Sequence, residues 1–460
     1  MFTGDPFVDT GSVVIEILQK IYSQKELIDL IYLASNWFIY KWDGKIDSLQ
    51  LNSMITHNSR RGSQEKREKA EDDTMKFFKK LFNSEGITFE GYCRICGKNE
   101  KLFKAGREIY PISGSSAFVN YHHSHEEGLL LCKDCITKLF FLPLAVVQMG
   151  GKLAILHLHN EATKNYWINK VIKVNLNDLS RNISTGILKS DLKNPKNALF
   201  SFATDIILTF NIENDYLQLY HFTNFGTSPD CEIYTLPNPV FRYLSKVLKS
   251  VKKDWYYFLK KFYNIKNAVW DIKTNEWVKK SKNKTIDFDE YKDNRNEVIE
   301  KLLYGKSLLP IFRKFYKENF QNNKEVSILL LDYYLKEVKN MNTKQIELIK
   351  RIGKSVIEIA KKDDNNFKKY LTMIEGTSRA HQLRAALIHV IKKHYSNGEK
   401  NPLITLEEYV NYLFPDGSHW SEVRDILIIY LYELLHKENI EGVEIDEINL
   451  KTPEEELTEF

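Results

Sequence analysis

The sequence predicts an α+β N-terminal body with an embedded zinc-binding module, followed by an all-α C-terminal helical bundle. Three observations lead to this prediction: two CxxC pairs in the first third of the chain, strand patterns mixed with helical ones up to about residue 239, and helical periodicity in the remainder. With 460 residues, 43% of them hydrophobic, the chain is long enough for two to four domains with ordinary cores.

We expect three segments. Residues 1–239 form the α+β body, in which 153–159 and 216–222 have strand patterns. Residues 240–340 form a basic, mainly helical continuation of this body. Residues 341–460 form the C-terminal helical bundle, because their apolar side chains recur at helical spacing.

The net charge of +5 is unevenly distributed along the chain. Residues 241–320 contain 20 Lys and Arg against 10 Asp and Glu, whereas residues 437–460 contain 2 against 9. Clustered charge of one sign creates a local field that attracts or repels a polyanion. The basic stretch is equally well explained as the solvated face of helices, so charge alone does not decide for nucleic acid.

Compartment is predicted from the absence of a secretory signal and from cysteine usage. The N-terminus lacks a basic signal region, and no apolar run reaches the ~18 residues of a membrane helix. Four of the five cysteines form CxxC pairs, which in a reducing cytosol favours metal over disulfides. We therefore expect a cytoplasmic protein without a membrane partner.

The two CxxC pairs are the strongest chemical signal. Two thiolates separated by two residues reach one tetrahedral ion, and four thiolates close its shell, so the expected cofactor is a structural Zn²⁺. The predicted ligands are Cys93, Cys96, Cys132 and Cys135. The fifth cysteine, Cys231, is expected to be a small buried hydrophobe.

The insert between the two pairs holds 35 residues, more than the ~15–20 of common zinc sites. Three alternatives therefore stay open: a histidine among the ligands, no metal, or a redox role. The candidate histidines are His122, His123 and His125. A metal-anchored loop with a basic start also suits contact with phosphates or base edges, although a soluble surface loop explains the same lysines. The predicted nucleic-acid contacts are Lys98, Lys101, Lys104, Arg107 and Asn120 in this region, and Asn224 further on. A cap of the turn beside Gly226 explains Asn224 equally well.

Four features in the order of the chain carry a family resemblance. They are residues 2–11 (FTGDPFVDTG), the two CxxC pairs, residues 220–226 (YHFTNFG), and residues 413–415 (LFP) followed by 420–425 (WSEVRD). The chain thereby resembles the CXXC-CXXC CRISPR-associated family, the large subunit of the type I-B Cascade effector complex. The matches are spread over nearly the whole chain.

The resemblance implies a subunit that is not an enzyme. It would help recognise the protospacer-adjacent motif in duplex DNA, stabilise strand separation and dock the helicase-nuclease, while base pairing reads the target. The implied partners are CRISPR RNA, target DNA, the helicase-nuclease and the other Cascade subunits, including the backbone, guide-handle-binding and small subunits. The absence of GxxxxGK[ST], HExxH and GxSxG motifs agrees with this expectation.

The resemblance also suggests that the C-terminal region is made separately as a small subunit. Met341 precedes the first predicted helix of the bundle, and Lys336, Glu337 and Val338 permit a ribosome-binding sequence just upstream. Met341 is equally well an ordinary loop residue. Two other classes of function remain as alternatives: a nucleic-acid-processing enzyme with an accessory zinc ribbon, and a zinc-stabilised protein-interaction scaffold.

Overall fold

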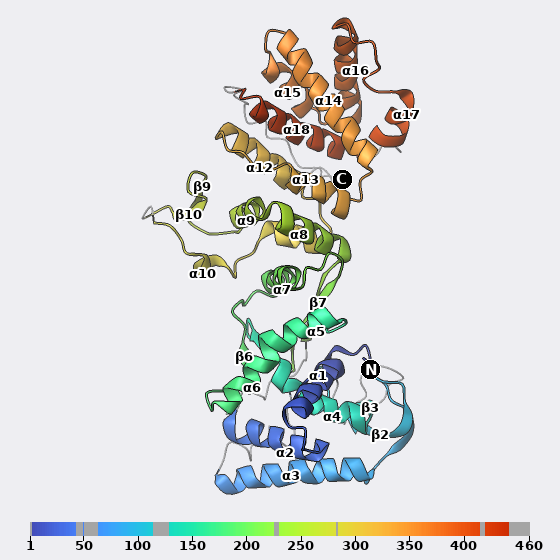
Figure 1. Ribbon diagram of the computed structural model, residues 1–460, viewed down its shortest axis with the longest axis vertical. Helices are drawn as coiled ribbons and strands as arrows, with labels where there is room; N and C mark the ends of the chain where they lie inside the picture. The colour runs from blue at the N-terminus through green and yellow to red at the C-terminus, as the bar shows by residue number, and fades with distance from the viewer. Residues whose placement is uncertain are drawn as a thin grey trace. The chain divides into compact units, whose positions relative to one another are not determined.

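The computed structural model describes residues 2–42, 49, 63–113, 128–224, 230–281, 284–414 and 419–440. The chain divides into two compact units: Met1–Ile212 with Tyr216–Leu236, and Glu213–Asp215 with Pro237–Phe460. The first unit mixes helices and strands, and the second is mainly helical (Figure 1). A mixed fold with a helical C-terminal region is therefore confirmed at that level.

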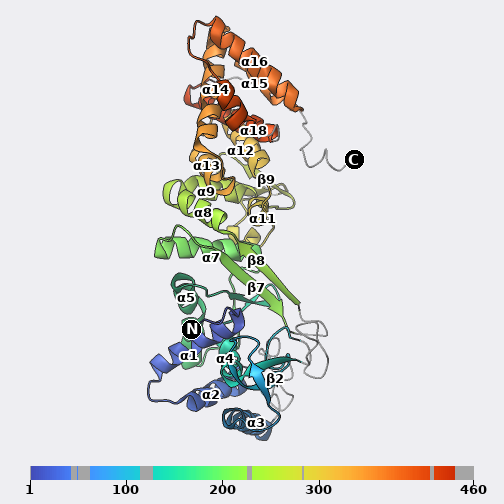
Figure 2. The same cartoon turned by 90° about the vertical axis from the view of Figure 1, so that its right-hand side faces the viewer.

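A five-stranded sheet forms much of the core of the first unit. Its strand order is β6-β4-β5-β7-β8, and all neighbours are antiparallel except β4 and β6. The long pair β7–β8 is seen side by side in Figure 2. The strands are β4 (Val147–Met149), β5 (Lys152–Leu156), β6 (Leu188–Lys189), β7 (Leu217–Thr223) and β8 (Asp230–Leu236). The strands predicted within 153–159 and 216–222 are confirmed as β5 and β7.

The helices of the first unit begin and end at residues suited to those positions. Asp5 is the N-cap of α1 and accepts hydrogen bonds from the backbone N–H groups of Phe7 and Val8. Pro6 follows at the first helical position, where its missing N–H costs nothing. The helices are α1 (Pro6–Ile21), α2 (Leu27–Asn36), α3 (Gln64–Asn83), α4 (Lys133–Phe141), α5 (Glu161–Trp167), α6 (Lys173–Ser180) and α7 (Pro195–Phe210), with shorter turns at Trp37–Lys41, Leu142–Ala145 and Ile168–Ile172.

In its described residues, the second unit consists of helices and one hairpin. The hairpin strands β9 (Ala268–Asp271) and β10 (Glu276–Lys279) were not predicted, because their four residues each are too short for a clear alternating pattern. The helices are α8 (Asn238–Ser250), α9 (Lys252–Lys261), α10 (Phe288–Tyr291), α11 (Glu297–Leu303), α12 (Leu309–Gln321), α13 (Leu329–Tyr333), α14 (Thr343–Lys362), α15 (Phe367–Glu375), α16 (Ala380–Ser396), α17 (Leu406–Glu408) and α18 (Trp420–Lys437), with π turns at Tyr334–Val338 and Tyr409–Leu413.

The predicted segments 240–340 and 341–460 lie in the same compact unit. α12, from the first segment, packs against α18, from the second, and α18 also packs against α14. Arg313 of α12 donates to the Asp425 carboxylate of α18 at 2.9 Å. The two segments therefore share one core across residue 341.

Candidate metal centre

A small antiparallel sheet brings the two CxxC pairs together. β1 (Phe89–Tyr92) leads directly into Cys93, and β2 (Asn99–Ala105) follows the first pair. β3 (Leu129–Cys132) pairs with β2, so that Leu102 lies opposite Cys132. The long insert leaves β2 and returns on its neighbour β3. Its length therefore does not separate the two pairs in space.

The four thiols converge on a single point. The Cys93 and Cys135 sulfurs lie 3.8 Å apart, and those of Cys96 and Cys132 lie 3.6 Å apart. All four sulfurs lie within 4.8 Å of one another, and all five cysteines are free of disulfides. A tetrahedron with metal–sulfur bonds of about 2.3 Å has sulfurs about 3.8 Å apart, whereas a disulfide needs about 2.0 Å. The spacing fits a metal held by four thiolates.

The local backbone favours thiolates at this point. Cys132 is the N-cap of α4 and Cys135 lies in its first turn, so both sulfurs sit at the positive end of the helix. The backbone N–H of Cys132 donates to the Cys93 sulfur at 3.4 Å. Hydrogen bonds from the thiols of Cys132 and Cys135 hold the pKa of Cys93 well below its ordinary value.

The first CxxC pair forms a tight turn that ends at Gly97. The Gly97 N–H donates to the Cys93 carbonyl at 3.0 Å, and the Cys93 N–H donates to the Lys98 carbonyl at 2.9 Å. Gly97 has a φ of +70°, and a Cβ there would meet nothing within 4 Å. Glycine is therefore needed for backbone conformation and not for space.

The basic residues predicted to contact nucleic acid have different surroundings. Lys98 forms an ion pair of 3.2 Å with Asp134, and thereby bridges the two CxxC pairs. Lys101 and Lys104 are exposed on β2, and the Lys104 ammonium lies 5.7 Å from the centre of the Phe89 ring. Lys101 and Lys104 are therefore both exposed on a strand of the small sheet that brings the two CxxC pairs together.

Arg107 and Asn224 bind each other inside the first unit. The Arg107 guanidinium donates to the Asn224 carbonyl, and the Asn224 amide donates to the carbonyls of Arg107 and Leu49, both at 2.8 Å. The Asn224 side-chain oxygen accepts from the Ile112 N–H, and the residue is fully buried. As folded, Asn224 secures the start of the insert to the end of β7. Its side-chain oxygen and both side-chain amide hydrogens are therefore already used within the fold.

Three further predictions concern Asn120, the histidines of the insert, and Cys231. Asn120 and the three histidines of the insert, His122, His123 and His125, lie outside the described residues. Within the described residues, the four cysteines are the one cluster of three or more metal-ligating side chains. The prediction for Cys231 was wrong in degree: it is half-buried on the edge strand β8, and burial raises the pKa of its thiol to about 11.

The N-terminal motif supports the metal centre, a role that sequence reasoning missed. α1 packs on α4, the helix that carries Cys135. At the crossing, a Cβ on Gly11 would lie 1.9 Å from the Lys138 carbonyl oxygen. The Tyr110 hydroxyl, in the insert, donates to Asp5 at 2.6 Å, and burial raises the pKa of Asp5. The signal in the sequence for this close approach was Gly11, a small residue within an otherwise apolar helical pattern.

Comparison with known proteins gives no relative: no family model, curated protein or solved structure matches this chain. None of the described helices is long and apolar enough to cross a membrane.

Proposed function

We propose that this chain is the large subunit of a type I-B CRISPR RNA-guided surveillance complex and that its four cysteines hold a structural Zn²⁺. The observation that carries the proposal is the convergence of both CxxC pairs on one point, next to α1, the helix that the N-terminal motif begins. These are two of the four features in which the sequence resembles that family. A closed shell of four thiolates leaves no position for a substrate, which suits a structural ion.

The zinc would fix the two ends of the insert. Both CxxC pairs lie beside strands from which the insert departs and to which it returns, and Lys101 and Lys104 are exposed on one of these strands. Phosphate contacts by such lysines would position duplex DNA, while guide pairing would read the target. The proposed partners are guide RNA, duplex DNA, the other subunits and the helicase-nuclease.

Metal identity is tested by elemental analysis of the purified chain. Zinc near one equivalent per chain is expected, and loss of zinc in a Cys132→Ser variant would place it at this cluster. Iron with a coloured thiolate spectrum would contradict the zinc assignment, because a tetrahedral four-sulfur site also accepts iron.

Function is tested by reconstitution with guide RNA and partner subunits. Duplex binding that requires both the complex and a short flanking motif is expected. A Lys101→Gln/Lys104→Gln variant should weaken this binding, whereas a Lys20→Gln/Lys25→Gln control, which removes equal charge from exposed lysines elsewhere in the first unit, should not. Metal-dependent cleavage of DNA by the chain alone, or binding insensitive to salt, would contradict the proposal.

Separate production of a small subunit from Met341 is part of the proposal. A fragment from Met341 would lack α12, which packs on α18 in the full chain, and Asp425 would lose its Arg313 partner. The fragment would therefore need another surface against α18. Silent recoding of the codons for Lys336–Val338 that left its abundance unchanged would contradict an internal start.

A further inference from the structure

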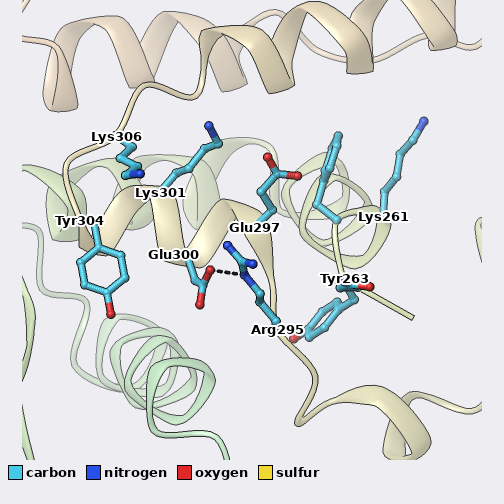
Figure 3. A pocket seen from close by; sticks show the side chains of 10 residues that line it. Lys261, Tyr263, Arg295, Glu297, Glu300, Lys301, Tyr304 and Lys306 are labelled. Carbon is cyan, nitrogen blue, oxygen red and sulfur yellow. Dashed lines mark hydrogen bonds and ion pairs between the residues drawn. The ribbon is translucent and has the colours of Figure 1, made fainter. Parts of the chain in front are cut away.

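A pocket of about 650 Å³ lies in the second unit, within the size range of small-molecule sites (Figure 3). It is formed by the end of α9, the residues before α11, α11 itself and the turn that follows. The charged and aromatic side chains that matter most are those of Lys261, Arg295, Glu297, Lys301, Tyr304 and Lys306.

The end of α11 places two lysines side by side. Gly305 follows the helix with a φ of +66°, and the Lys306 N–H donates to the Lys301 carbonyl at 2.8 Å. This is the Schellman arrangement, in which the residues at these two positions commonly make an apolar contact. Here both are lysines, and Figure 3 shows their side chains extending on the same side of the pocket.

The charges around the pocket do not cancel. Arg295 is paired with Glu300, and the Lys261 ammonium is paired with Glu318 outside the pocket. Within the described residues, neither Lys301 nor Lys306 has a hydrogen bond or ion pair through its ammonium group. Glu297, which has no ion pair there either, is the one lining carboxylate left to oppose them.

A second pocket, of about 460 Å³, adjoins the first. The two share Phe262, Glu297 and Lys301, and the second adds Lys314, which is exposed. At the edge of the first pocket, the Tyr304 side chain is 59% exposed and points away from the two lysines (Figure 3). Cations for a phosphate and an exposed aromatic ring for a base therefore occur together.

We propose that this pocket binds a nucleoside phosphate, with the phosphate held by Lys301 and Lys306. The Tyr304 ring offers a face to the base, and the Glu297 carboxylate accepts a hydrogen bond from a sugar hydroxyl or a base amino group. The ligand is either a free nucleotide or one unit of a single-stranded nucleic acid. The inference concerns the second unit alone and does not rest on the function proposed above.

A structural explanation of the same lysines makes a different prediction. Cations at the C-terminal end of a helix interact favourably with its dipole. If that is their role, their replacement changes the stability of the second unit and leaves ligand binding unchanged. Binding and thermal unfolding are therefore measured on the same variants.

The test uses the full chain, a labelled single-stranded DNA of about ten nucleotides, and AMP as the free nucleotide. Binding of at least one probe should weaken about tenfold in Lys301→Gln/Lys306→Gln. The control Lys253→Gln/Lys280→Gln removes the same charge from two exposed lysines of the second unit that do not line this pocket. Equal weakening in both variants, or none in either, would overturn the proposal.

Further arms identify the source of the phosphate and the role of charge. Loss of AMP binding alone identifies a free nucleotide, whereas loss of DNA binding with a salt slope reduced by about 1.4 identifies two phosphate contacts to a strand. The Lys301→Arg/Lys306→Arg variant keeps both positive charges, so it should bind better than Lys301→Gln/Lys306→Gln. Glu297→Gln removes the charge that opposes the phosphate and keeps an oxygen that accepts the hydrogen bond, so it should strengthen binding relative to Glu358→Gln, an exposed acid on α14. Unchanged binding in Tyr304→Ala would contradict the role assigned to the ring.

Discussion

The two compact units differ in how they hold their buried polar groups. In the first unit, four thiols from the two CxxC pairs meet at one point. In the second, buried charges are paired between helices: Asp425 accepts from Arg313 and from its neighbour Arg424, and Arg424 also donates to the Thr377 carbonyl at 2.6 Å. Loss of one shared ion would release all four of its ligands, whereas loss of one ion pair leaves the other ion pairs intact. The units should therefore respond differently to removal of one component.

The largest expected effect follows from loss of the proposed Zn²⁺. Structural zinc contributes on the order of 10 kcal/mol or more in small zinc-dependent folds, which rivals the whole stability of a domain. Chelation, or Cys132→Ser/Cys135→Ser, should abolish amide hydrogen-exchange protection in β1, β2, β3 and α4 while the second unit stays protected. Cys231→Ser is the control. Unchanged protection of the first unit after chelation would contradict the structural role of the metal.

The next effect is expected from the buried ion pairs of the second unit. Asp425→Ala leaves the Arg424 and Arg313 guanidinium groups without their carboxylate, which should cost about 3–5 kcal/mol because one partner of a buried pair is removed. Asp289→Ala removes the partner of Lys292 at an exposed site and should cost less than about 1 kcal/mol. Urea unfolding gives the loss in free energy of unfolding for each variant. Equal losses would show that the buried ion pairs stabilise the second unit no more than the exposed one.

Two glycines, one in each unit, lie where two helices cross, and their replacement by alanine can be compared. A Cβ on Gly11 would lie 1.9 Å from a backbone oxygen of α4, whereas a Cβ on Gly353 of α14 would lie 2.8 Å from the Tyr430 ring of α18. Gly11→Ala should therefore destabilise more than Gly353→Ala, since a ring shifts more easily than a backbone; overpacking typically costs about 1–3 kcal/mol. Thermal unfolding tests the order. Gln19→Ala on the exposed face of α1 is the control.

The smallest effect is a pH dependence in the first unit. His221 is buried, with its Nε2 3.0 Å from the Met149 carbonyl, and burial lowers its pKa below the ordinary 6.5. The unfolded chain then binds more protons than the folded one, so stability falls as pH decreases below about 6.5, by on the order of 1 kcal/mol per unit of pKa shift. His221→Gln should flatten stability measured from pH 7 to pH 5, and an unchanged slope would exclude this histidine as a cause.

Local features could be predicted from the sequence because they depend on short-range chemistry. The CxxC spacing identified the four cysteines that could hold a metal ion, and the alternation in 153–159 and 216–222 located β5 and β7. The short hairpin β9–β10 was beyond such reasoning, since four residues carry too little pattern.

Tertiary structure decided the surroundings of each side chain. A sequence cannot show that Asn224 is fully buried and bonded to Arg107, because these residues are distant in the chain and meet only in the folded unit. The same holds for the ion pair of Lys98 with Asp134 and for the close approach at Gly11. Residue types and spacing determined which chemistry is available in this protein. Packing over long sequence separation determined which of those groups are already used inside it and which still face solvent.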